Sequence, residues 1–410
     1  MTQIAKERSQ FLVILLIVFL GFLGISMPYL IFPALFLNPA YSIVSENIGE
    51  FTKFALLGIT LAAYPLGQFF GSPVLGSLSD DYGRKPILTT SLFITAICNL
   101  ITGFAIYWQM LWLLILSRLI AGLMEGNISI ARAMATDLPT ISKHDAFGKI
   151  NAAASIAYLI GPLFGGLLTD KELFEGLTIS TPFYFICIFF VALTFLSIFV
   201  IEDHSNPKNR KVITILERIN LIRRLSLLFT NNRLRFLMLT STLFTLAVDI
   251  FYEFGPIYLT LKWELNPSDL IIYNASLCAG LAIGNGILPA YFTQFSKPSV
   301  IINSITTFSL FLLAIILTNS THLMIVLFGL CGLSIGLAVT FLTVKISNSV
   351  PDSIQGEVLG AQVSLRVLGD AIICLFGGFL LFFSSKIILV FATLVSFVSM
   401  GFYSYKKNKV

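Results

Sequence analysis

Two carboxyl side chains, Asp249 and Glu253, lie four residues apart within the apolar segment 236–260. Residues at this spacing share one face of a helix, so the two carboxyls point in the same direction. Two carboxylates in hydrocarbon cannot both stay ionised cheaply, because burial penalises each charge and the like charges repel each other. The pair is therefore predicted to bind protons or substrate. The alternative is a structural role, in which both acids pair with Arg366.

Charged residues also interrupt two other apolar segments. Arg366 and Asp370 have the same four-residue spacing, and they serve either coupling or substrate binding, or they form an ion pair within one helix. Arg118 lies deep in the segment 109–131, and Glu125 follows on roughly the same face of a helix. A guanidinium in an apolar segment needs a partner or a water-filled cavity, and Glu125 is one candidate partner.

These residues stand out because the chain contains few charges. Of its 410 residues, 56% are hydrophobic and 11% are charged. A soluble domain cannot carry this much apolar surface, whereas a polytopic membrane protein can. We therefore predict an all-α membrane protein with twelve transmembrane helices. The predicted spans lie near 11–36, 54–75, 86–107, 109–131, 147–169, 182–201, 236–260, 270–292, 299–318, 322–343, 357–383 and 386–404.

The net charge of +5 reflects topology and does not indicate a nucleic-acid partner. With the N-terminus in the cytoplasm, all but six of the 26 basic residues fall on the cytoplasmic side, which is the positive-inside pattern. The exceptions are Lys53, Lys171, Lys262 and Lys386 outside, and Arg118 and Arg366 within the bilayer. We therefore expect both termini in the cytoplasm.

The longest polar stretch, 202–235, divides the chain near its middle and carries eight basic residues. Apolar residues recur in it at helical spacing from Val212 to Ile222, so it is either an amphipathic helix on the cytoplasmic membrane surface or a solvated linker. The flanking regions, 1–201 and 236–410, are predicted to form two six-helix bundles. Weak internal repetition supports two equivalent halves, because Gly148 and Gly161 match Gly356 and Gly369.

No catalytic or metal-binding constellation occurs in the sequence, so we do not expect an enzyme. The five cysteines, Cys98, Cys187, Cys278, Cys331 and Cys374, are odd in number and lack the spacing of metal ligands. We interpret them as small apolar filler residues. The phosphate-binding pattern of an ATPase is also absent from the sequence, so we predict that the proton gradient supplies the energy and that no cofactor is bound.

Residues 76–86, Gly-Ser-Leu-Ser-Asp-Asp-Tyr-Gly-Arg-Lys-Pro, form a dense charge cluster between two apolar runs. We predict a tight turn, in which Gly76 and Gly83 permit positive φ and Pro86 begins the next helix. A turn that merely obeys the positive-inside pattern is the alternative. That alternative does not require glycines and charges at this spacing.

This turn resembles the signature loop between the second and third helices of major facilitator superfamily transporters. Arg118 stands where the family's second motif has an arginine, whose proposed role is to modulate proton transfer. The fifth apolar segment resembles the family's antiporter motif, with one Gly-to-Ala change, over Gly148, Ala157, Gly161, Pro162, Gly165 and Gly166. The resemblance covers essentially the whole chain and is strongest over 60–170.

The run from Gly126 to Ala133, followed by Asp137 and by Phe147-Gly148, looks like the twelve-helix drug/proton antiporters, particularly the tetracycline-exporter branch. Two positions depart from that branch. Gly21 stands where those exporters usually carry an acid, and Arg132 stands where they carry a neutral polar residue. Both departures argue against tetracycline itself as the substrate and favour proton handling in the C-terminal half.

The resemblance implies the major facilitator fold, two pseudo-symmetric six-helix bundles with the substrate site between them. It also implies a latch that locks the two bundles in the outward-facing state, with Asp80 near the N-terminus of the eleventh helix. The latch residues are Gly76, Asp80, Gly83, Arg84, Lys85 and Asp137. Aromatic and polar residues that either line a central cavity or simply pack are Tyr29, Phe32, Tyr64, Asn127, Tyr158, Phe251, Tyr252 and Tyr258.

We therefore predict a proton-coupled exporter of amphipathic small molecules, monomeric, in a bacterial inner membrane. Protonation of Asp249, Glu253 or Asp370 from outside is expected to release substrate outward and reset the carrier. One alternative is a dedicated transporter of a single metabolite or siderophore. A receptor or scaffold with a transporter-like fold is the other, and such proteins tend to carry long extensions that this chain lacks.

Overall fold

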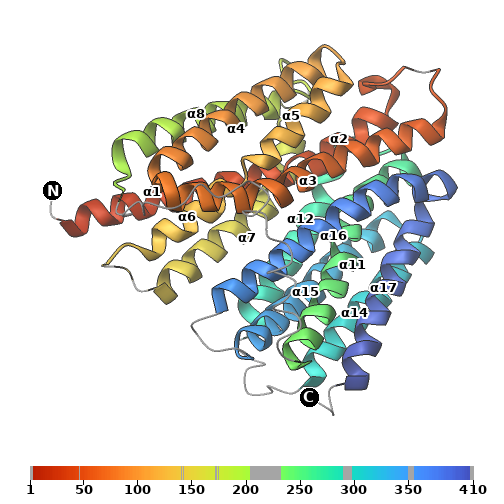
Figure 1. Ribbon diagram of the computed structural model, residues 1–410. Coiled ribbons are helices and arrows are strands. Elements are labelled where there is room, and N and C mark those ends of the chain that lie inside the picture. Colours follow the sequence, from red (N-terminus) through yellow and green to blue (C-terminus); the bar gives the residue numbers. More distant parts are fainter. Residues whose placement is uncertain are drawn as a thin grey trace. The chain divides into compact units, whose positions relative to one another are not determined.

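The computed structural model describes residues 3–45, 47–139, 141, 143–170, 173, 175–203, 232–289, 298–349 and 355–406. Within these ranges the chain forms helices and no strands (Figure 1). Ten helical segments are long and apolar enough to cross a membrane, and two shorter apolar helical stretches, Ala152–Leu167 and Ile271–Ile287, accompany them. Each of the twelve predicted spans corresponds to one of these segments, so the predicted all-α polytopic class is confirmed.

The chain divides into two compact units. Unit 1 comprises Met1–Ile48 and Ile59–Ile219, and unit 2 comprises Gly49–Gly58 and Asn220–Val410. The first turns of the second span therefore belong to unit 2, although they precede most of unit 1 in the sequence. The amphipathic helix predicted between Val212 and Ile222 lies outside the described residues.

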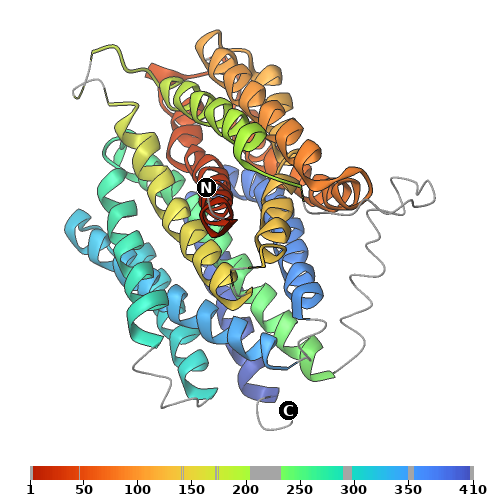
Figure 2. The same ribbon diagram turned by 90° about the vertical axis from the view of Figure 1, so that its left-hand side faces the viewer.

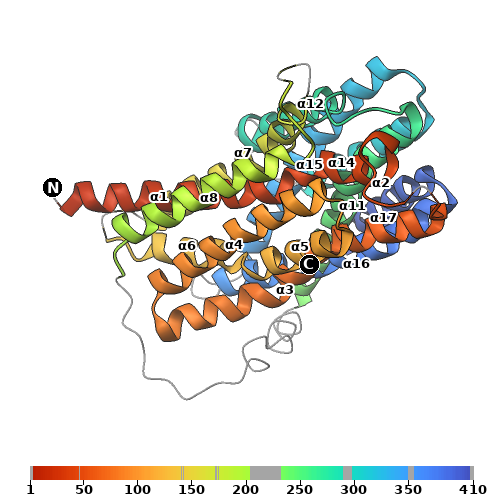
Figure 3. The same ribbon diagram turned by 90° about the horizontal axis from the view of Figure 1, so that it is seen from above.

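Unit 1 is built from helices that pack in pairs. Its helices are α1 (Gln3–Ser26), α2 (Pro28–Leu37), α3 (Glu50–Tyr82, from Ile59 on), α4 (Arg84–Tyr107), α5 (Leu111–Leu123), α6 (Gly126–Thr136), α7 (Lys143–Leu167) and α8 (Thr181–Val200), with a short 3-10 turn, η1 (Pro39–Tyr41). The most extensive helix packing in unit 1 is between α4 and α8 and between α1 and α7. Figure 2 shows the red α1 beside the yellow α7. Figure 3 shows α8 lying along α1.

Two spans predicted to be continuous, 11–36 and 109–131, are each divided into two helices. The first breaks at Met27, because Pro28 has no N–H group to continue the hydrogen bonds of α1. In the second span the helical winding becomes tighter at Met124 and Glu125, where the Glu125 N–H donates a hydrogen bond to the Gly122 carbonyl at 3.0 Å. Such bonds to the third preceding residue are tighter than α-helical ones and mark a local change of winding.

The predicted turn over 76–86 is much shorter in the structure. Helix α3 continues to Tyr82, so Gly76 lies inside a helix, and the expectation of a turn at Gly76 is wrong. Among residues 76–86 only Gly83 has positive φ, +98°, and α4 begins directly after it with Pro86 in its first turn. Charged residues can lie outside the bilayer while they are still part of a helix. The end of an apolar run therefore does not mark the end of the helix.

Unit 2 repeats this architecture around an aromatic core. Its helices are α11 (Asn232–Trp263), α12 (Ile271–Ala282), the π-helical η2 (Ile283–Ile287), α14 (Pro298–Leu317), α15 (Thr321–Ser347), α16 (Gln355–Phe383) and α17 (Ser385–Lys406). Helix α12 packs on α15, and α11 packs on both α16 and α17 (Figure 1). The Phe251 ring lies 4.9 Å from the Phe328 ring and 6.1 Å from the Phe308 ring, so Phe251 is a core residue.

Candidate functional site

Asp249 of α11 and Arg366 of α16 form an ion pair that joins the two helices. Arg366 Nη2 donates to Asp249 Oδ1 at 2.6 Å, and Arg366 Nε donates to Oδ1 at 3.2 Å and to Oδ2 at 3.0 Å. The Asp249 side chain is 4% exposed, whereas that of Arg366 is 43% exposed. Arg366 therefore forms the pair between helices with Asp249, one of the acids considered for it. Hydrogen bonds between a guanidinium and a carboxylate are shorter and stronger than those between neutral groups.

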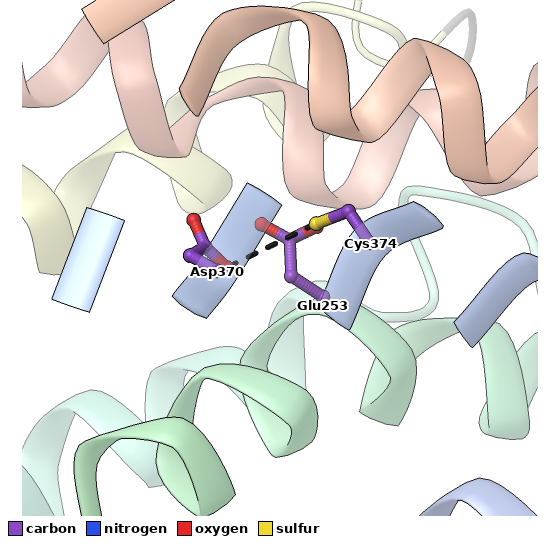
Figure 4. A group of neighbouring side chains, drawn as sticks. All are labelled: Glu253, Asp370 and Cys374. Carbon is purple, nitrogen blue, oxygen red and sulfur yellow. Dashed lines mark hydrogen bonds between the residues drawn. The ribbon is translucent and has the colours of Figure 1, made fainter. Parts of the chain in front are cut away.

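Glu253, Asp370 and Cys374 form a second polar group in unit 2. One carboxyl oxygen of each acid and the Cys374 sulfur all lie within 4.8 Å of one another. The Cys374 thiol donates to Asp370 Oδ1 at 3.9 Å (Figure 4). The interpretation of Cys374 as a mere filler residue therefore overlooked a polar contact. Its four-residue distance from Asp370, which puts both on one face of α16, is the signal that the sequence contained.

A buried polar cluster in unit 1 is centred on Tyr64. Its hydroxyl donates to Glu125 Oε2, and the Arg118 guanidinium lies 4.5 Å from the centre of the Tyr64 ring and 5.7 Å from that of Phe32. Arg118 and its candidate partner Glu125 thus both contact Tyr64, Arg118 through the ring face and Glu125 through the hydroxyl. A cation over an aromatic face is attracted by the quadrupole of the ring, whose face has a negative electrostatic potential.

A close helix contact explains why Tyr64 reaches this position. A Cβ atom placed on Gly122 of α5 would overlap the backbone oxygen of Tyr64 in α3. Only glycine lets the two backbones approach this closely. The contact lies between Arg118 and Glu125 in the chain, so it brings the Tyr64 side chain within reach of both.

Four polar side-chain atoms of Arg118, Glu125 and Asn127 have no hydrogen-bond partner among the described residues. They are Arg118 Nε, Glu125 Oε1, and both amide atoms of Asn127. Buried polar atoms are almost always paired in native proteins, with protein groups or with water. These atoms are therefore candidates to hold a water molecule, a proton or a polar group of a substrate.

The other residues predicted to line a cavity make contacts within their own units. The Tyr29 hydroxyl, in α2, is 2.9 Å from the Tyr158 hydroxyl, in α7, and their rings meet edge to face. Tyr252 lies beside Phe251 in α11, with ring centres 6.4 Å apart. Tyr258 is buried and accepts a hydrogen bond from Lys262 at 3.0 Å. The contact of Tyr29 with Tyr158 thus joins α2 to α7, and Tyr258 contacts Lys262 near the end of α11.

Arg84 and Asp137, two of the predicted latch residues, are in direct contact. Arg84 Nη1, in the first residue of α4, donates to Asp137 Oδ2, just after α6. Asp80 is exposed in the last turn of α3, and Lys85 follows Arg84. The part of the latch that would join the two bundles stays a prediction.

Asp203, which the sequence analysis did not single out, completes the start of α4. The residue preceding α4 is Gly83, which has no side chain to cap the helix, and Asp203 Oδ2 accepts from the Lys85 backbone N–H at 3.1 Å. A carboxylate at a helix N-terminus satisfies a free N–H and favours the helix dipole. The signal in the sequence was an acid directly after the sixth apolar segment.

Asp203→Ala is expected to lower the free energy of unfolding by about 0.5–2 kcal/mol, the usual cost of losing a helix cap. Glu202→Ala is the matched control, because Glu202 is exposed and only approaches Lys6, at 3.5 Å. Denaturant unfolding of both variants in detergent measures the difference. Equal stabilities would show that the Asp203 carboxylate does not cap α4.

The antiporter-like motif lies within α7 and packs on the break between α1 and α2. A Cβ atom on Gly161 would overlap Ser26 Oγ and lie 2.8 Å from the Leu23 carbonyl oxygen. Gly165 approaches the Met27 carbonyl in the same way, and Gly148, Pro162 and Gly166 lie in the same helix. The small residues of the motif therefore serve close helix packing in unit 1, whatever further role they have.

Comparisons with known proteins point to one family. A family model described as Major Facilitator Superfamily matches residues 14–374. The tetracycline resistance protein, class H, of Pasteurella multocida is 32% identical over 197 residues, which are 48% of this chain and 45% of that protein. The uncharacterized MFS-type transporter YuxJ of Bacillus subtilis (strain 168) is 27% identical over 331 residues, 79% of each chain.

A solved structure shares the fold at low sequence identity. The crystal structure of the human organic anion transporter MFSD10 superposes with a TM-score of 0.69 and 17% identity, over 97% of this chain and 99% of that one. At this identity the likeness shows the fold alone. The aligned stretch of this chain spans less than half of the Pasteurella protein, 45% of its length, so that protein's activity does not transfer directly.

Proposed function

The chain belongs to the Major Facilitator Superfamily, and from that premise we propose that it is a proton-coupled exporter of amphipathic small molecules. It is a multi-pass membrane protein and a carrier of small molecules, not an enzyme. Relatives named for resistance to tetracycline and to multiple drugs support export as the direction of transport. Alternating access between two helical units is the mechanism we propose.

The observation that carries the proposal is the buried pair of Asp249 and Arg366. A proton that binds Asp249 neutralises the carboxylate, so the charge-assisted hydrogen bonds from Arg366 are lost. The guanidinium then loses its hold on Asp249, and loss of the proton restores the pair. Because the two states differ in one ion pair between α11 and α16, proton binding can bias the arrangement of these helices.

We propose that the Tyr64 cluster of unit 1 serves the substrate. Arg118 Nε can donate a hydrogen bond and Glu125 Oε1 can accept one, and neither atom has a partner among the described residues. The Arg118 guanidinium also lies over the aromatic faces of Tyr64 and Phe32. An amphipathic molecule presents polar groups next to an apolar ring or chain, which matches this surrounding. In this proposal, protons bind in unit 2 and the substrate binds in unit 1.

We place the protein in a bacterial inner membrane with both termini in the cytoplasm. The excess of basic residues in the segments assigned to the cytoplasm supports this orientation. It puts Arg84 and Asp137 at the cytoplasmic ends of their helices. Their contact is then placed to contribute to the latch expected from the family resemblance.

Transport into everted membrane vesicles tests the proposed function. We expect vesicles that contain the protein to accumulate several unrelated amphipathic dyes when a proton gradient is imposed, since export from a cell becomes uptake in this orientation. A protonophore should remove the accumulation, and vesicles without the protein supply the background. Accumulation that a protonophore leaves unchanged would refute proton coupling. Failure to move any dye, with transport of one metabolite, would favour the dedicated transporter.

A further inference from the structure

Glu253, Asp370 and Cys374 combine two kinds of metal-binding donor at one place in unit 2. The oxygen and sulfur atoms lie within 4.8 Å of one another, with Glu253 contributed by α11 and the other two by successive turns of α16 (Figure 4). Glu253 is 4% exposed and Cys374 is 0% exposed. The three side chains thus form a compact, buried donor set.

The interior of α11 and α16 carries more acidic than basic side chains, although the two helices as a whole carry equal numbers. Arg366 is the only basic residue of α16, and its guanidinium makes three hydrogen bonds to Asp249. The basic residues of α11, which are Arg233, Arg235 and Lys262, lie near its ends. Three carboxyls and one guanidinium therefore meet in the interior of these two helices. Such an excess of negative charge in an apolar region favours a bound cation.

We propose that Glu253, Asp370 and Cys374 bind a divalent transition-metal ion of the Zn²⁺ class, a site that goes beyond the transport function proposed above. Thiolate with carboxylate is a donor set that suits borderline-soft Zn²⁺, whereas Mg²⁺ prefers oxygen donors alone. Donor atoms around tetrahedral Zn²⁺ lie roughly 3.3–3.8 Å apart. Side-chain rotations of about 1 Å therefore close the site, and the thiol gives up its proton when the metal binds.

Close backbone packing holds Cys374 in place for this role. A Cβ atom on Gly58 would lie 2.6 Å from the Cys374 carbonyl oxygen and 3.1 Å from the Gly378 Cα. The start of α3, which belongs to unit 2, thus rests directly on the α16 backbone at the cysteine. A donor on a rigid helix that cannot shift along its axis is suited to binding metal.

Spectroscopic titration of the purified, tag-free protein with Co²⁺ tests the site. We expect one Co²⁺ per chain, with the charge-transfer absorbance of a thiolate–cobalt bond, and displacement by Zn²⁺ but not by Mg²⁺. Cys374→Ser should abolish this absorbance. Glu253→Gln and Asp370→Asn should weaken binding by at least the roughly 10- to 100-fold that loss of an outer-shell partner costs.

Cys331→Ser is the matched control, because Cys331 is also fully buried but lies in α15. It should keep the absorbance of the unaltered protein, and so should Asp249→Asn, which separates metal binding from proton coupling. Size-exclusion profiles and melting temperatures identify any variant that fails to fold. Absence of the absorbance in the unaltered protein overturns the proposal without any variant. Its persistence in folded Cys374→Ser, or its loss in folded Cys331→Ser, overturns it as well.

Discussion

Asp249→Asn is expected to reduce proton-driven efflux to the level of vesicles that lack the protein, while exchange of substrate down its own gradient continues. Asparagine keeps the shape of the side chain but cannot take up a proton, so the cycle loses its link to the proton gradient. The Arg366 guanidinium also loses its charged partner. Dye transport in everted vesicles measures the coupled reaction, and exchange of labelled dye at equal concentrations measures the uncoupled one.

Two further variants decide whether the Asp249–Arg366 pair is a coupling device or only a structural one. Glu264→Gln removes an exposed carboxyl just beyond α11 and should leave both reactions unchanged. The double variant Asp249→Asn with Arg366→Gln removes both charges, which usually costs less stability than removal of one partner. If the folded double variant regains proton-driven efflux, the pair is structural and coupling at Asp249 is refuted.

Gly122→Ala is expected to have the largest effect on the structure of unit 1. The added methyl group overlaps the backbone oxygen of Tyr64, and neither helix can give way by rotating a side chain. Forced overpacking costs typically about 1–3 kcal/mol, and a backbone collision lies at or above the upper end. Separation of α3 from α5 also breaks the hydrogen bond from Tyr64 to Glu125. Recovery of monodisperse protein and its melting temperature measure the loss.

Gly76→Ala is the matched control for this prediction. It is the same substitution in the same unit, but an added Cβ at Gly76 meets no atom within 4 Å. Because Gly76 lies inside α3, alanine should raise helix stability by up to about 1 kcal/mol. If Gly122→Ala is as stable as Gly76→Ala, the close contact between α3 and α5 is not required.

The number and position of the membrane spans could be predicted because they depend on local composition. A span needs about 20 apolar residues, and the chain has so few charges that their positions delimit the segments. Arg84 and Asp137 could likewise be named together as latch residues from the family motif, and they are in contact in unit 1. Such features need no knowledge of how helices are rotated against one another.

The partners of the buried charges could not be predicted, because they depend on helix rotation and on the distance between helices. The sequence pattern placed Arg118 and Glu125 on one helix face, yet both contact Tyr64 of α3, since Gly122 admits the α3 backbone. The sequence left Asp249, Glu253 and Asp370 open as partners of Arg366, and the packing of α16 on α11 brings Asp249 into hydrogen-bond contact with it. Hydropathy likewise gives no sign of the tightened winding at Glu125.

The ion pair of Asp249 and Arg366 has an electrical consequence. Together the two side chains carry no net charge, but with a proton on Asp249 the same pair carries one positive charge. A full charge that crosses the bilayer gains or loses about 2.3 kcal/mol per 100 mV of membrane voltage. Under the proposed proton coupling, voltage therefore acts on this pair when Asp249 is protonated and not when the two side chains are ion-paired. A cell that is negative inside would draw the protonated carrier inward before any substrate contributes.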